Sequence, residues 1–90
     1  MSKTRAQLIE ELASRAGLPP LTASETESIL ALAAVAAYGT GDRTSAPLAS
    51  FLAGVAAAQA GDRTQALDTF RRLVADLAPV RPHSRRTADP

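Results

Sequence analysis

The chain lacks cysteine altogether, and it has one histidine and few aromatic residues. Without cysteine there is no disulfide frame and no thiolate nucleophile. Because the lone His83 lies close to the end of the chain, a histidine triad or a histidine-based metal site within one chain is not expected. Aromatic residues make up 3% of the sequence. Roughly twenty of the residues are Ala, a composition that favours closely packed helices over strands.

Neither sign of charge is in clear excess. Ten Lys and Arg oppose nine Asp and Glu, which leaves a net charge of +1. A charge so close to zero gives no field that would attract nucleic acid or an anionic membrane. No run of apolar residues reaches the roughly 18 that a membrane span needs, and the first residues do not resemble a signal peptide. We therefore expect a cytoplasmic protein that binds neither membrane nor nucleic acid.

Four segments carry apolar residues at helical spacing, and each has start and stop signals. The first three helices are expected at about residues 5–16, 25–38 and 47–60. A fourth helix is expected between a cap at Asp62 and a stop at Pro79. The sequence therefore predicts an all-α protein, with a compact antiparallel four-helix domain over residues 4–78.

Capping boxes mark the first two helices. Thr4 with Gln7 fits the start of the first, and Ser24 with Glu27 fits the start of the second. The later part of the second helix has no charged residue, so we expect it to be the central and most buried helix.

The third and fourth helices each carry an apolar stripe. The stripe of the fourth is expected to be buried, with Arg63 on the opposite, charged face. The stripe of the third consists of Leu48, Phe51, Leu52, Val55 and Ala56.

After the fourth helix the composition changes. Residues 79–90 contain three prolines, scattered arginines and no apolar face, so they cannot bury enough surface to offset the entropy of ordering. We expect residues 79–90 to form a disordered basic tail.

Motifs for catalysis are missing from the sequence. It contains no phosphate-binding Gly-x-x-x-x-Gly-Lys, no Gly-x-Ser-x-Gly and no His-Glu-x-x-His. Glu25 and Glu27 are two residues apart on a helix and face different ways, which suits interaction with the helix dipole better than acid–base catalysis. We expect no enzyme activity, no cofactor and no metal.

One polar cluster is a candidate binding site. Tyr38, Arg43 and Thr44 lie in or beside the only long loop between helices, ahead of the third helix. Free backbone N–H groups at that helix start, together with the Arg43 guanidinium, could bind a carboxylate or phosphate. The alternative is that these are solvated turn residues. The sequence Gly-Asp-Arg-Thr of residues 41–44 recurs at residues 61–64, where we interpret it as a common way to end one helix and cap the next.

Two resemblances bear on function. The segment around Gly61, with its apolar stripe and Pro79, looks like the second half of a tetratricopeptide repeat. More specifically, residues 37–39 and 43–54, which contain Ala-Pro-Leu-x-x-Phe-Leu, resemble a small helical domain of uncharacterised function. That family occurs in actinobacteria, alone or fused to the guanylyltransferase that makes molybdopterin guanine dinucleotide. The likeness covers about residues 6–60.

The chain departs from that family at three positions. Tyr38 stands where the family usually has His, and Ala34 and Val35 stand where it usually has Arg and Asp. The resemblance implies an accessory role in molybdenum-cofactor biosynthesis. We therefore expect a non-enzymatic helical interaction domain with a protein partner or a second copy. The alternative is a tetratricopeptide-like helical hairpin that binds a protein.

Overall fold

The computed structural model describes residues 2–79, which contain four α-helices and no strand. The helices are α1 (Arg5–Arg15), α2 (Ala23–Thr40), α3 (Ser45–Gln59) and α4 (Arg63–Leu77). The prediction of an all-α four-helix fold is confirmed. Except for Pro79, the predicted tail lies outside the described residues.

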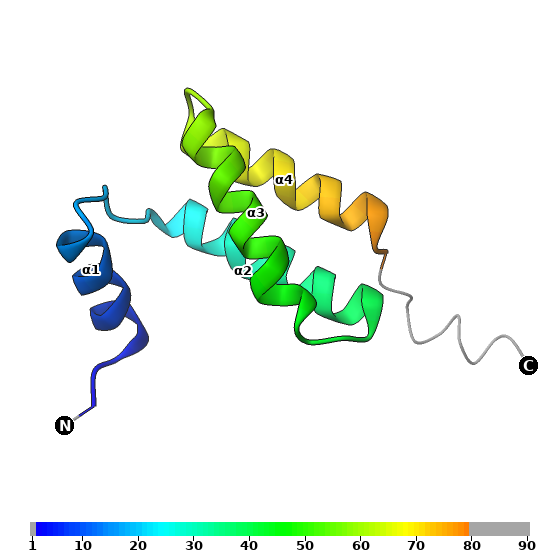
Figure 1. Cartoon of the computed structure of the whole chain (residues 1–90), viewed down its shortest axis with the longest axis horizontal. Helices are drawn as coiled ribbons and strands as arrows, with labels where there is room; N and C mark the ends of the chain where they lie inside the picture. The colour runs from blue at the N-terminus through cyan, green and yellow to red at the C-terminus, as the bar shows by residue number, and fades with distance from the viewer. Residues whose placement is uncertain (1, 80–90) are drawn as a thin grey trace, which may run out of the picture.

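Three of the helices pack on one another. Helices α2, α3 and α4 all make pairwise contacts, so each touches the other two. Figure 1 shows these three side by side, with α1 set apart and joined to α2 by the segment that contains Pro19 and Pro20. Helix α1 faces the start of α2 across a groove lined by Ile9 of α1 and by Leu21 and Leu30.

The core between α2, α3 and α4 is small. Its buried hydrophobic residues are Leu32, Ala36, Ala53, Ala57 and Leu67. Three of the five are alanines, which let the helix backbones approach closely but bury little area per residue. The domain therefore has few large side chains to hold it together.

The helix boundaries follow local capping chemistry. The Thr4–Gln7 capping box at the start of α1 is confirmed. The predicted Ser24–Glu27 box is wrong, because the box that starts α2 is Thr22 with Glu25. The Thr22 hydroxyl accepts from the Glu25 N–H at 3.1 Å, and the Glu25 carboxylate accepts from the Thr22 N–H at 2.9 Å. Helix α2 thus starts two residues earlier than expected.

The end of α2 is also displaced. The helix continues through Gly39 and ends at Thr40, followed by the C-cap residue Gly41, which takes the left-handed conformation with φ 74°. Gly39 lies against the backbone of Ala78, where a Cβ atom would collide with the Ala78 carbonyl. The missing side chain therefore lets the ends of α2 and α4 come together.

Candidate functional site

The predicted binding residues lie at the end of α2 and the start of α3. Tyr38 is on α2 with 73% of its surface exposed, Arg43 is exposed in the connecting loop, and Thr44 is the N-cap residue of α3. All three are open to solvent, so a partner could reach them.

The hydrogen-bond donors of this loop are already engaged by acceptors within the loop, however. The Asp42 carboxylate accepts from both the Thr44 N–H at 2.9 Å and the Thr44 hydroxyl at 2.7 Å, and these hydrogen bonds lower the pKa of Asp42. The N–H groups of Ser45 and Ala46 donate to the carbonyls of Asp42 and Arg43. The expectation of free N–H groups at this helix start is therefore wrong for Thr44, Ser45 and Ala46. Any anion bound here would depend chiefly on Arg43.

The stripe predicted for the third helix points away from the core. We call four residues of α3, with their exposed fractions, the α3 apolar face: Leu48 (66%), Phe51 (69%), Leu52 (57%) and Val55 (40%). The opposite side of α3 carries Ala53 and Ala57, which are buried against Leu32 and Leu67. The reason is steric, because the alanine side lets α3 lie close to α2 and α4, and the larger side chains then have to face outward.

The sequence of α3 makes this exposure unusual. The helix has no Asp, Glu, Lys or Arg between Ser45 and Gln59. A helix that is apolar on all sides is normally covered on all sides, and clustered exposed apolar residues mark interaction surfaces. The α3 apolar face is therefore the strongest candidate for a binding surface in the described part of the chain.

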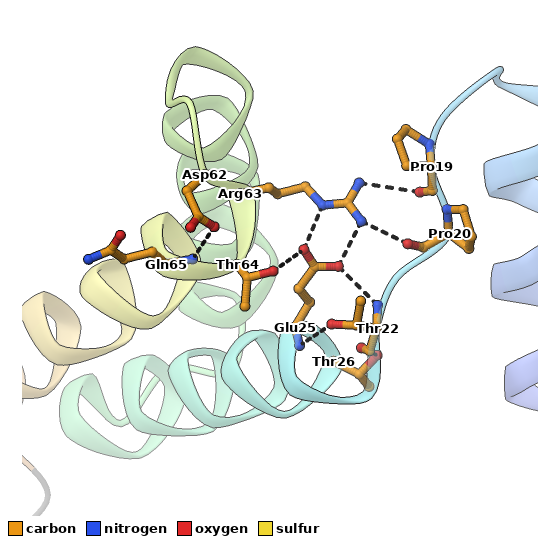
Figure 2. Close-up of polar contacts among 9 residues, drawn as sticks. All are labelled: Pro19, Pro20, Thr22, Glu25, Thr26, Asp62, Arg63, Thr64 and Gln65. Carbon is orange, nitrogen blue, oxygen red and sulfur yellow. Dashed lines mark hydrogen bonds and ion pairs between the residues drawn. The ribbon is translucent and has the colours of Figure 1, made fainter.

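A polar cluster that the sequence did not reveal joins three parts of the chain. The carboxylate of Glu25, only 2% exposed, accepts from Arg63 Nε at 2.9 Å, from Arg63 Nη2 at 2.7 Å and from the Thr64 hydroxyl at 2.8 Å. Arg63 also donates to the backbone carbonyls of Pro19 at 3.2 Å and Pro20 at 2.7 Å. Figure 2 shows the guanidinium between the carboxylate and the two prolines.

The electrostatics of this cluster indicate a structural role. The hydrogen bonds from Arg63, reinforced by those from Thr22 and Thr64, lower the pKa of Glu25 to about 2. A carboxylate this acidic stays ionised at neutral pH and is a poor proton acceptor. The cluster therefore links the starts of α2 and α4 to the segment that leads from α1.

The prediction that Arg63 lies on an exposed face is wrong, because Arg63 is partly buried over Glu25. The sequence signal that could have pointed to it is the second Gly-Asp-Arg-Thr. In residues 61–64 the Arg and Thr both bind Glu25, whereas in residues 41–44 the Thr binds the neighbouring Asp42. The same four-residue sequence thus makes different contacts at its two positions.

Residues 2–79 also bear on metal and membrane binding. Over that range no three His, Cys, Asp or Glu side chains gather closely enough to hold a metal ion. None of the helices found there combines the length and the hydropathy needed to cross a membrane.

Comparison with known proteins gives one match. No curated protein and no solved structure matches the chain. A family model described as a domain of unknown function, DUF6457, matches residues 2–86 and so spans all the helices described above. The chain therefore belongs to the DUF6457 family, a family of domains of unknown function.

Proposed function

We propose that the chain is a non-catalytic helical interaction domain that binds protein through the α3 apolar face. The observation that carries this proposal is the inverted packing of α3, with Ala53 and Ala57 buried and Phe51 and Leu52 exposed. In a helix that acts only as part of a monomer core, the larger apolar side chains would point inward.

The energetics favour a covered state. Complete burial of a Leu or Phe side chain is worth roughly 1.5–3 kcal/mol, and the four residues of the α3 apolar face are still 40% to 69% exposed. Covering all four gains several kcal/mol before the entropy of association is subtracted. That gain is enough to support binding, provided that the partner surface is apolar as well.

The finer proposal is an accessory role in molybdenum-cofactor biosynthesis. It rests on the resemblance of residues 43–54 to a domain that is found fused to the molybdopterin guanylyltransferase. That segment includes Leu48, Phe51 and Leu52 of the α3 apolar face. A domain that accompanies an enzyme in one polypeptide can bind the same enzyme as a separate chain through the same surface.

The test is calorimetric titration of the chain with the purified guanylyltransferase from the same organism. Leu52→Glu places a charge in the centre of the α3 apolar face and should abolish binding. The control is Leu30→Glu, the same change at an exposed leucine of α2 that faces the groove toward α1. Equal binding by both variants and the unmodified chain would show that α3 is not the binding surface. A lack of binding by the unmodified chain would show that the guanylyltransferase is not the partner.

The loop ahead of α3 is proposed as a secondary contact to an acidic group of the partner. Arg43 would supply the charge, and Tyr38 and Thr44 would lie beside it. Arg43→Ala should then weaken binding by roughly 1.5–3 kcal/mol, the range for a charge-assisted hydrogen bond. Undiminished affinity of Arg43→Ala in the same titration would show that the loop makes no such contact.

A further inference from the structure

We infer that Arg63 fixes the position of α1 relative to the core formed by α2, α3 and α4. The group that does so, called the Arg63 clamp below, is the Arg63 guanidinium with its acceptors, the Glu25 carboxylate and the backbone carbonyls of Pro19 and Pro20. The inference concerns a part of the chain other than the α3 apolar face and does not depend on the proposed function.

Helix packing does not hold α1 in place. Within the described residues, α1 makes none of the close contacts by which α2, α3 and α4 pack on one another, and Figure 1 shows it standing apart. None of its 11 residues is buried, and the side chains of Leu8 and Leu12 are 46% and 55% exposed. The position of α1 is therefore set chiefly by the segment that joins it to α2.

The backbone of that segment has little freedom of its own. The Leu18 N–H donates to the Ala13 carbonyl at 2.8 Å, as part of a Schellman motif that joins Leu18 to the end of α1. Pro19 and Pro20 follow, and the ring of each restricts its φ angle. Only one residue then separates Pro20 from Thr22, which caps α2. Fixing the two proline carbonyls therefore fixes the direction in which α1 leaves the core.

Arg63 is placed to fix both carbonyls. Its Nη1 donates to Pro19 at 3.2 Å and its Nη2 to Pro20 at 2.7 Å, while Nε and Nη2 donate to the two oxygens of the buried Glu25 carboxylate (Figure 2). A guanidinium is planar, so the paired bonds to Glu25 determine where its other donors point. In residues 2–79, no other hydrogen bond joins the segment between α1 and Thr22 to the core.

The Arg63 clamp also sets the width of the groove between α1 and α2. Ile9 of α1 lies on one side of this groove, and Leu21 and Leu30 lie on the other. Because Arg63 holds the two sides apart at the proline segment, the groove should lose its fixed width when the donors of Arg63 are removed.

A distance measurement between two spin labels by electron paramagnetic resonance tests the inference. The chain has no cysteine, so Ser14→Cys on α1 and Thr69→Cys on α4 give the only two labelling sites. Both positions are exposed, and neither belongs to the Arg63 clamp. The labelled but otherwise unmodified chain should show a single narrow distance distribution.

The test variant combines Glu25→Gln with Arg63→Met. It removes the Arg63 clamp without leaving a buried charge unpaired. Glutamine still suits the capping box at the start of α2, and methionine keeps an apolar stem but has no donors. The width of the distance distribution should increase about twofold or more, because α1 is then joined to the core by a segment that nothing ties down.

The matched control is Thr64→Val. It removes the hydroxyl that donates to the same Glu25 carboxylate, but it leaves the hydrogen bonds from Arg63 to the prolines in place. This variant should be less stable and should keep the narrow distribution. The amide spectra of α2, α3 and α4 check that the core stays folded. If the double variant loses the core, Arg63→Lys replaces it, since one ammonium group cannot donate to Glu25 and both prolines in the geometry of a guanidinium.

Three results would overturn the inference. A broad distribution in the unmodified chain would show that α1 is not held in one position. A folded double variant, or Arg63→Lys in its place, with a distribution as narrow as that of the unmodified chain would show that something other than Arg63 holds α1. Equal broadening in Thr64→Val would show that α1 responds to any weakening of the core and not to the Arg63 clamp.

Discussion

The ion pair between Glu25 and Arg63 should contribute strongly to stability, and Arg63→Ala tests this. The substitution leaves the Glu25 carboxylate, which is 2% exposed, without its cation. Removing one partner from a buried ion pair typically costs about 3–5 kcal/mol. The pKa of Glu25 gives a similar figure, since a fall from 4.5 to about 2 corresponds to about 3 kcal/mol at 1.36 kcal/mol per unit. For a domain of this size, such a loss is a large part of the total stability.

The lowered pKa of Glu25 also determines how the free energy of unfolding depends on pH. Because Glu25 is more acidic in the folded chain than in the unfolded one, its contribution is complete above pH 4.5 and is lost as the pH falls toward about 2. Between those values the unfolded chain binds a proton that the folded chain does not. The stability of the unmodified protein should therefore rise with pH across this window, and the rise should be much smaller in Arg63→Ala.

Urea denaturation followed by circular dichroism, at neutral pH and at about pH 3, is the assay. The control is Arg72→Ala, which removes an exposed partner of Asp68 and should change the free energy of unfolding only slightly, because solvent screens the pair. If Arg63→Ala is unfolded without urea, Arg63→Lys serves in its place. It retains the charge but loses the paired hydrogen bonds, and its loss of unfolding free energy should lie between those of Arg63→Ala and Arg72→Ala. A cost for Arg63→Ala no larger than that for Arg72→Ala would refute the reasoning.

Three other predictions concern packing and capping, each measured by thermal or urea unfolding. Gly39→Ala should destabilise the protein by about 1–3 kcal/mol, because its Cβ meets the Ala78 backbone. Gly54→Ala, which has open space at that position, should stabilise the protein by about 0.4–1 kcal/mol. Equal effects of the two substitutions would show that Gly39 has room for a side chain. Leu67→Ala should cost about 2–5 kcal/mol, since Leu67 is one of two buried leucines, and a smaller loss would mean that the core collapses around the gap. Thr22→Ala should cost about 1 kcal/mol through loss of the capping box at α2, and an unchanged midpoint would show that the cap is dispensable.

Local signals in the sequence were enough to place the helices. The Thr4–Gln7 box, the Asp62 cap and the prolines act within a few residues, so spacing alone locates them. The start of α2 was misplaced because Ser24 and Glu27 fit the same pattern as Thr22 and Glu25. Glu25 and not Glu27 completes the capping box in the structure. Glu25 also binds Arg63 and Thr64, which lie far away in the chain.

The candidate surface was harder to predict for a related reason. Periodicity shows that an apolar stripe exists on α3, but it does not show which side faces the core when the other side is made of alanines. The contacts of Ala53 and Ala57 with Leu32 and Leu67 decide it, and they depend on how closely three helices approach. The Glu25–Arg63 pair likewise joins residues 38 apart in sequence, beyond the reach of any local pattern.

The claim that α3 presents a binding surface is tested most directly by NMR. Backbone amide spectra of the isotope-labelled chain would be recorded with increasing amounts of the unlabelled guanylyltransferase, because a partner populates the bound state by mass action. We expect the amide signals of Leu48, Phe51, Leu52 and Val55 to change together as the partner is added, while those around Glu25 stay fixed. Spectra that do not change, or changes that centre on α1, would contradict the claim.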